Sequence, residues 1–172
     1  LGYYDATHQT LRHARWAEDA WSIKTVDTTG NVGSYASLAL DASGDPHVSY
    51  YDSDNKDLKY ARWTGTDWIS ATVDGASDVG RYTSLALDDN GVPHISYYDD
   101  TNFALKYAYW GGSAWLSETV DSGFVGWGTS LALDDAGLPH VSYFDIVNND
   151  VKYARRTGSL WVVERVDDAG FR

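Results

Sequence analysis

Tryptophan residues recur in pairs along the chain, and they are the side chains best suited to bind a ligand. The pairs are Trp16 and Trp21, Trp63 and Trp68, and Trp110 and Trp115, followed by a last pair in which Arg156 stands opposite Trp161. Two rings that bracket a tight hairpin can stack across the strands and stabilise the edge of a sheet. Flat aromatic faces beside Asp, Asn and Arg side chains are also what a sugar ring requires, and a repeated weak site gains avidity. The pairs therefore predict either structural staples or a sugar platform.

Histidine recurs directly after proline at three regularly spaced positions, which are His47, His94 and His140. Each would lie in a separate copy of the fold, so the three need not converge on a metal ion or form a proton relay. A histidine that is hydrogen-bonded within a sheet explains the same recurrence. His8 and His13 stand where the next copy has other residue types, which weakens any shared site. We expect the recurring histidines to be structural.

Aspartate recurs at three phases: Asp41, Asp88 and Asp134; Asp52, Asp99 and Asp145; and Asp27, Asp74, Asp121 and Asp167. A carboxylate at the end of a strand accepts backbone N–H groups and closes a turn, so we interpret most of these residues as structural. The run from Asp52 to Asp57 begins with the spacing of a calcium loop but lacks its glycine and distal glutamate. Calcium stays open as a ligand, and no other cofactor is expected.

Catalysis requires unlike groups to meet at one place, whereas repetition multiplies the same groups. The candidates for function are therefore positions at which the copies differ, such as Ser34, Arg81 and Trp127 in the connections between copies, and the loops around Asn55, Asn102 and Asn148. The candidate ligand-binding residues are Trp63, Trp68, Trp110, Trp115, Arg81 and Trp127. A glycosidase needs paired carboxylates, but all the glutamates lie at or near the predicted outer strands. We predict a protein without catalytic residues and keep the propeller domain of a carbohydrate-processing enzyme as the alternative.

Composition sets limits on the partners of the chain. Its 172 residues carry 25 acidic and 13 basic side chains, which gives a formal net charge of −12. Such a chain repels nucleic acid, and it shows no apolar run long enough to span a bilayer. Cysteine and methionine are both missing from it. We expect a secreted protein or a window cut from a longer one, whose fold rests on packing and sheet hydrogen bonds.

These candidate residues belong to an internal repeat of about 47 residues, which is the size of a propeller blade. Residues 37–74 align without gaps on residues 84–121, a third copy covers residues 130–167, and residues 1–27 match the back portion of the unit. Within one unit, β-branched and aromatic runs at residues 83–88, 94–99, 105–110 and 115–120 predict four short strands. The turn residues between them, Asp88 to Gly91 and Gly111 to Ser113, predict hairpins and hence antiparallel pairing.

The sequence therefore predicts an all-β chain of propeller-type blades, with an incomplete blade at residues 1–27 and complete blades at residues 35–74, 82–121 and 129–167. An open stack of sheets or a β-solenoid is the alternative. The strand SLALD is expected to be innermost. We expect Ser84 and Ala86 on its crowded channel side, and Leu85 and Leu87 between neighbouring sheets.

The repeat style LALDxxGxPHVSYYD resembles bacterial β-propeller repeats, in particular the blades of NHL-type propellers. The paired tryptophans resemble those of lectin propellers. The resemblance extends over the whole chain but is generic and singles out no specific family. It implies an extracellular binding module, and glycans or further copies of the chain are the expected partners.

The ends of the repeat array carry a further expectation. Leu1 aligns with Val48 inside the second strand of a blade, so the first blade should lack its innermost strand. Arg172 precedes the point at which another SLALD strand would begin. An exposed strand edge invites another strand, and we expect either a longer chain or an assembly of copies that forms a ring or a filament.

Overall fold

The computed structural model describes residues 1–167, which form fifteen strands and no helix. The first blade contains β1 (Gly2–Asp5), β2 (Thr10–Ala17) and β3 (Ala20–Asp27). The second contains β4 (Val32–Leu40), β5 (Pro46–Asp52), β6 (Asp57–Trp63) and β7 (Trp68–Asp74). The third contains β8 (Val79–Leu87), β9 (Pro93–Asp99), β10 (Ala104–Trp110) and β11 (Trp115–Ser122). The fourth contains β12 (Val125–Leu133), β13 (Pro139–Asp145), β14 (Asp150–Thr157) and β15 (Leu160–Asp167).

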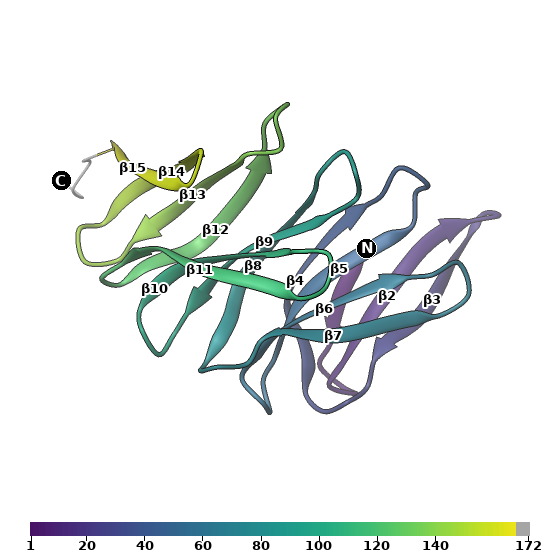
Figure 1. Cartoon of the computed structure of the whole chain (residues 1–172). Helices are drawn as coiled ribbons and strands as arrows, with labels where there is room; N and C mark the ends of the chain where they lie inside the picture. Colours follow the sequence, from purple (N-terminus) through teal and green to yellow (C-terminus); the bar gives the residue numbers. More distant parts are fainter. Residues whose placement is uncertain (168–172) are drawn as a thin grey trace.

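Each blade is one antiparallel sheet in which consecutive strands are neighbours. This confirms the predicted blades, including a first sheet with three strands. The four sheets follow one another in chain order, and the first and last blades lie at opposite ends of the array, so these residues do not close a four-bladed ring (Figure 1). The strand expected after Arg172 falls outside the described residues. No helix in the described part of the chain could span a membrane.

The hairpin between the first two strands of a blade follows the predicted turn chemistry. In the third blade, Gly91 donates its N–H to the carbonyl oxygen of Asp88 over 2.8 Å and has a φ of 75°. The Asp88 carboxylate accepts the N–H groups of Asn90 at 2.9 Å and Val92 at 2.8 Å. Asp41 and Asp134 do the same in their own blades, which confirms the structural interpretation of this phase.

The innermost strands begin earlier than predicted, at Val32, Val79 and Val125. The sequence predicts this strand of the third blade only from residue 83 onward and places Arg81 in the connection between copies. The strand instead continues through it by two register shifts, between Val79 and Arg81 and between Arg81 and Ser84. Gly80 and Tyr82 adopt positive φ angles of 109° and 53°, which bend the strand without ending it.

The hydrophobic core lies between blades rather than inside any one sheet. In the joint between the second and third blades, Leu58 and Tyr60 from β6 pack against Val79, Leu85 and Ile95. Leu58, Val79 and Ile95 are fully buried. Complete burial of one such side chain contributes about 1.5–3 kcal/mol. Each blade therefore depends on its neighbours for most of its apolar contacts.

The small residues of the innermost strand correct one expectation. Ser84 and Ala86 do not line a channel but face the fourth blade: the Ser84 hydroxyl accepts the N–H of Leu131 over 3.0 Å, and Ala86 packs against the next core cluster. The predicted packing of Leu85 and Leu87 between sheets is confirmed. The short side chains allow adjacent innermost strands to approach closely.

A buried ionic contact is repeated in every joint. Asp74, at the end of the second blade, accepts hydrogen bonds from the Tyr97 hydroxyl at 2.7 Å and from the Lys106 ammonium group, both in the third blade. Asp27 with Tyr50 and Lys59, and Asp121 with Tyr143 and Lys152, repeat this arrangement. Aspartates of this phase thus link one blade to the next.

The loops between the second and third strands carry the possible calcium ligands. The Asp52 carboxylate accepts the N–H groups of Asp54 and Asn55, both at 3.1 Å, and that of Asp54 accepts the Asn31 N–H at 2.9 Å. Both carboxylates therefore accept hydrogen bonds from backbone N–H groups at this end of the blades. Within residues 1–167, no three or more His, Cys, Asp or Glu side chains are grouped so that they could hold a metal ion.

Candidate functional site: pockets between neighbouring blades

The tryptophan pairs stack at the outer hairpins as the sequence predicted. Ring centroids are 5.8 Å apart for Trp63 and Trp68 and 5.7 Å apart for Trp110 and Trp115, and both pairs are edge-to-face. Each pair closes the hairpin that joins the third and fourth strands of its blade. The rings remain partly exposed. They can therefore stabilise the hairpin and still offer an aromatic surface to a ligand.

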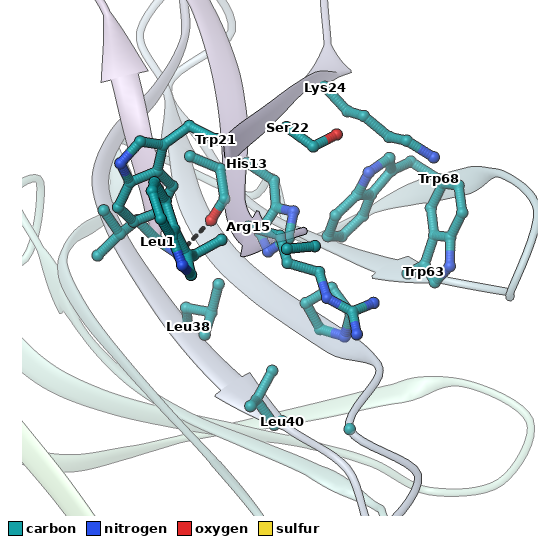
Figure 2. Close-up of a pocket in the computed structure, with 15 residues that line it drawn as sticks. Leu1, His13, Arg15, Trp21, Ser22, Lys24, Leu38, Leu40, Trp63 and Trp68 are labelled. Atoms are coloured by element: carbon teal, nitrogen blue, oxygen red, sulfur yellow. Dashed lines mark hydrogen bonds between the residues drawn. The ribbon is translucent and has the colours of Figure 1, made fainter. Parts of the chain in front are cut away.

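The first pocket lies between the first and second blades and has a volume of about 590 Å³. The first blade lines it with His13 and Arg15 from β2 and with Lys24 from β3. The second blade lines it with Trp63 and Trp68. Figure 2 shows the three basic side chains near these two rings, whereas Trp21, which also lines the pocket, lies further from them. Leu38 and Leu40 form its apolar floor.

The periodicity of a strand explains this arrangement. His13 and Arg15 are two residues apart on β2 and therefore share a face, and His13 is the cross-strand partner of Lys24. That face lies against the second blade: the His13 ring is 5.4 Å from the Trp68 ring, and the Lys24 ammonium group is 4.0 Å from the Trp63 ring centre.

The second pocket lies one joint further along the chain and also measures about 590 Å³. Arg62 from β6 occupies the place of Arg15, and Trp110 and Trp115 occupy the places of Trp63 and Trp68. Two consecutive joints thus combine one arginine of the preceding blade with the tryptophan pair of the following blade. The guanidinium group can donate several hydrogen bonds beside a flat apolar face.

The second pocket also contains a buried polar chain. His47 Nδ1 is hydrogen-bonded to the Tyr60 hydroxyl, while His47 Nε2 lies 3.7 Å from the Asp41 carboxylate. Burial lowers the pKa of His47 although Asp41 acts in the opposite direction. His94 and His140 repeat the hydrogen bond to tyrosine, which confirms that the recurring histidines are structural.

The third joint lacks the shared combination of residues. Tyr109 replaces the arginine, and Arg156 replaces the first tryptophan of the pair. Arg156 instead forms an ion pair of 2.7 Å with Glu118 of the preceding blade. An ion pair across the joint therefore occupies the place where the other two joints present an aromatic ring.

Arg81 and Trp127, the remaining predicted ligand-binding residues, lie on the opposite rim. Arg81 forms ion pairs of 3.3 Å with Asp78 and with Asp100, and its guanidinium lies 5.4 Å from the Tyr51 ring centre. Trp127 is 40% exposed and contacts the Tyr82 ring at 5.6 Å. The structure therefore divides the predicted residues into two groups, and only the four tryptophans meet in pockets.

Sequence reasoning missed Arg15, Arg62, His13 and Lys24. A signal for them was available, because positions 13, 24 and 156 differ from the corresponding positions in the other copies, and the copies differ where function is expected. The functional positions predicted from variation lie in the expected loops and connections, whereas these residues lie within strands.

Comparisons with solved structures show similarity to lectins. The structure is similar to a fucose lectin from Kordia zhangzhouensis solved in complex with methyl-fucoside, with 25% sequence identity and a TM-score of 0.51, over 75% of this chain and 96% of that one. It is also similar to an Aleuria aurantia lectin variant in complex with Fucα1-6GlcNAc, with 18% identity and a TM-score of 0.61, over 95% of this chain. The chain spans 57% of the length of the Aleuria lectin. No family model and no curated protein sequence matches it.

These similarities support the lectin-propeller side of the sequence resemblance. The resemblance to NHL-type blades stays a prediction, because the two neighbours described are both lectins.

Proposed function

We propose that the chain is a glycan-binding β-propeller protein that binds without catalysis, and that its sites are the two pockets between blades. The observation that carries the proposal is the repeated meeting of an arginine of one blade with the tryptophan pair of the next. Arg15 meets Trp63 and Trp68 in the first pocket, and Arg62 occupies the corresponding place in the second.

The chemistry of the pockets suits a sugar ring. The apolar face of a pyranose packs on an indole ring, while the guanidinium donates hydrogen bonds to ring hydroxyl groups. Each pocket volume of about 590 Å³ lies within the usual range for small ligands. Two weak sites on one rigid array strengthen attachment to a glycan surface that presents many copies of the ligand.

The comparisons support the same class of ligand, because the two structural neighbours described above are lectins solved with fucose-containing ligands. Asp41 is the only carboxylate among the residues that line either pocket, whereas glycoside hydrolysis requires two. This favours binding over the alternative of a carbohydrate-processing enzyme. We place the protein outside the cell, where glycan surfaces are accessible.

Calorimetric titration with methyl-fucoside, preceded by a glycan array, tests the proposal. We expect two sites per chain in the wild type, and Arg62→Ala should weaken the second by about tenfold or more because a charged hydrogen bond is lost. Arg81→Ala on the opposite rim should leave both affinities unchanged. Loss of binding in Arg81→Ala or Trp127→Ala, with Arg62→Ala unaffected, would move the site to that rim.

A second proposal concerns assembly, and it rests on the outer face of the fourth blade. Val151 occupies the position of Leu58 and Leu105, which are fully buried against a following blade, yet Val151 is 44% exposed. On the first blade, Trp21 and Ile23 are 53% and 52% exposed. We propose that each of these two faces packs on a further blade, which is supplied either by a longer chain or by another copy of the chain that associates head to tail.

Sedimentation over a range of concentrations tests this association. The wild type should form concentration-dependent dimers or longer species, and Val151→Lys should shift it towards the monomer because it places a charge on the apolar face. A wild type that stays monomeric at every concentration would contradict the assembly proposal and leave glycan binding unaffected.

A further inference from the structure

The first pocket gathers positive charge on a strongly acidic protein. Its lining includes Arg15, Lys24 and His13 but no aspartate or glutamate, although the chain has a formal net charge of −12. Arg15 and Lys24 are both exposed at the surface of the pocket. The local charge therefore opposes that of the whole molecule.

The two permanent cations of this pocket have no acidic partner. Within residues 1–167 no ion pair joins Arg15 or Lys24 to a carboxylate, whereas Lys59, Arg81 and Arg156 each form one. The Lys24 ammonium group lies instead over the face of Trp63, at 4.0 Å from the ring centre. Burial and the nearby positive charges of Arg15 and Lys24 lower the pKa of His13. Both cations therefore act on the same histidine.

The other two joints lack the lysine that contributes to the positive charge of the first pocket. The position of Lys24 is occupied by Ala71 in the second pocket and by Glu118 in the third joint. The second pocket also has Tyr60 in place of His13. The shared arginine and tryptophan pair is therefore combined with two further basic side chains in one joint, and with uncharged side chains at the same two positions in the next.

We infer that the first pocket prefers sugars that carry a carboxylate or a sulfate group over neutral sugars, whereas the second pocket has no such preference. This inference rests on the proposed glycan binding and assigns a ligand class to each site. The sugar ring would pack on Trp63 and Trp68, and its anionic group would face Arg15 and Lys24. A guanidinium binds a carboxylate or a sulfate through two parallel hydrogen bonds, which an ammonium group nearby reinforces.

The experiment titrates the wild-type protein with three matched probes: the methyl glycosides of glucose, glucuronic acid and glucose 6-sulfate. Binding at the first pocket is followed through the ring signals of His13 by NMR. The anionic probes should bind there about tenfold more tightly than methyl glucoside, and the preference should shrink as salt is added. The anion should also raise the pKa of His13, because it offsets the neighbouring positive charges.

Variants at one position in two copies provide the matched comparison. Lys24→Ala gives the first pocket the residue of the second and should remove most of the preference for anions. Ala71→Lys makes the opposite exchange and should create such a preference in the second pocket. Lys56→Gln removes a lysine that is 61% exposed and pairs with Asp78, away from both pockets, and it should change neither affinity.

The outcomes separate this inference from the proposed function. A tighter complex with either anionic probe, lost in Lys24→Ala, supports the inference, and comparison of the two probes shows whether carboxylate or sulfate fits better. If methyl glucoside binds as tightly as both anionic probes, the ligand assignment is overturned while glycan binding stands. If no sugar binds in either pocket, on the array or by titration, both proposals fail.

Discussion

At the scale of single residues, positions that are identical in all joints hold the blades together, and positions that vary set the chemistry of the pockets. Asp27, Asp74 and Asp121 each accept hydrogen bonds from a tyrosine and a lysine of the following blade. The position of Lys24 instead changes between lysine, alanine and glutamate. Comparison of the repeats thus distinguishes the side chains that join the blades from those that differ between the proposed binding pockets.

The joint around Asp27 leads to a prediction on acid stability. Burial opposes the charged form of Asp27, but hydrogen bonds from Lys59, Tyr50 and Thr29 outweigh it and lower its pKa to about 2. The folded state thus holds this proton more weakly than the unfolded state, in which the pKa is about 3.8–3.9. The stabilisation is complete above that value and is lost as pH falls from about 4 to about 2.

The Asp27→Ala variant should therefore unfold more easily at pH 7, by about 3 kcal/mol, because the buried Lys59 loses its hydrogen-bonded carboxylate and keeps only Asp52, at 3.9 Å. Its stability should also fall less steeply than that of the wild type between pH 4 and pH 2. Urea unfolding at a series of pH values measures both effects. Asp19→Asn, in the exposed hairpin after β2, serves as the control, and an equal loss in the two variants would contradict a role for the joint.

At the scale of elements, the bulged innermost strands determine how closely blades approach. Gly80 has a φ of 109°, and a Cβ atom there would lie 2.7 Å from the Cα of Leu58 in the preceding blade. Gly33 and Gly126 make the same approach to Leu11 and Leu105. The neighbour is backbone, which cannot move aside as a flexible side chain would.

Gly80→Ala should therefore destabilise the protein by about 3 kcal/mol, since it combines overpacking with an unfavourable left-handed backbone. The matched variant is Gly91→Ala, where φ is 75° but no atom lies within 4 Å of the added Cβ. Its cost should be about 1 kcal/mol from the backbone alone. Thermal and chemical unfolding compare the two, and a similar cost for both would mean that the blades can separate to admit the methyl group.

At the scale of the whole molecule, each joint between neighbouring blades contains a different set of side chains. The first joint contains basic groups beside the tryptophans, the second contains one arginine and Asp41, and the third is bridged by Arg156 and Glu118. The blades themselves differ little, so the proposed number of glycan sites depends on side chains at a few equivalent positions.

A triple substitution in the third joint tests this view. Tyr109→Arg, Glu118→Ala and Arg156→Trp together give it the residues of the second pocket. We expect calorimetry to show one additional neutral-sugar site per chain, with an affinity close to that of the second pocket. Arg156→Trp alone should add no site, because Glu118 would then lose its cationic partner and Tyr109 would still replace the arginine. A triple variant that folds normally without a further site would contradict the equivalence of the joints.

The blades could be predicted from the sequence alone, because strand periodicity and turn chemistry depend on residues that are close together in the chain. The Asp-x-x-Gly hairpins, the proline at the start of each second strand, and the tryptophans at the outer hairpin could all be assigned within one repeat. Local patterns also identified the incomplete first sheet. They failed at Val79 to Tyr82, where contact with the preceding blade keeps a glycine-containing segment extended.

Only the tertiary structure decided which residues meet. Arg15 shares a pocket with Trp63 and Trp68, which lie about one repeat further along the chain. They meet because the sheet of one blade packs face to face on the sheet of the next blade. No pattern within one repeat predicts which residues of neighbouring repeats meet, since this depends on how the sheets twist and on how closely their innermost strands approach. The same packing placed Arg81 and Trp127 on the rim opposite the four tryptophans, because successive turns of a meander alternate between its two ends. The candidate binding pockets of this chain therefore form between repeats, where residues of different copies face one another.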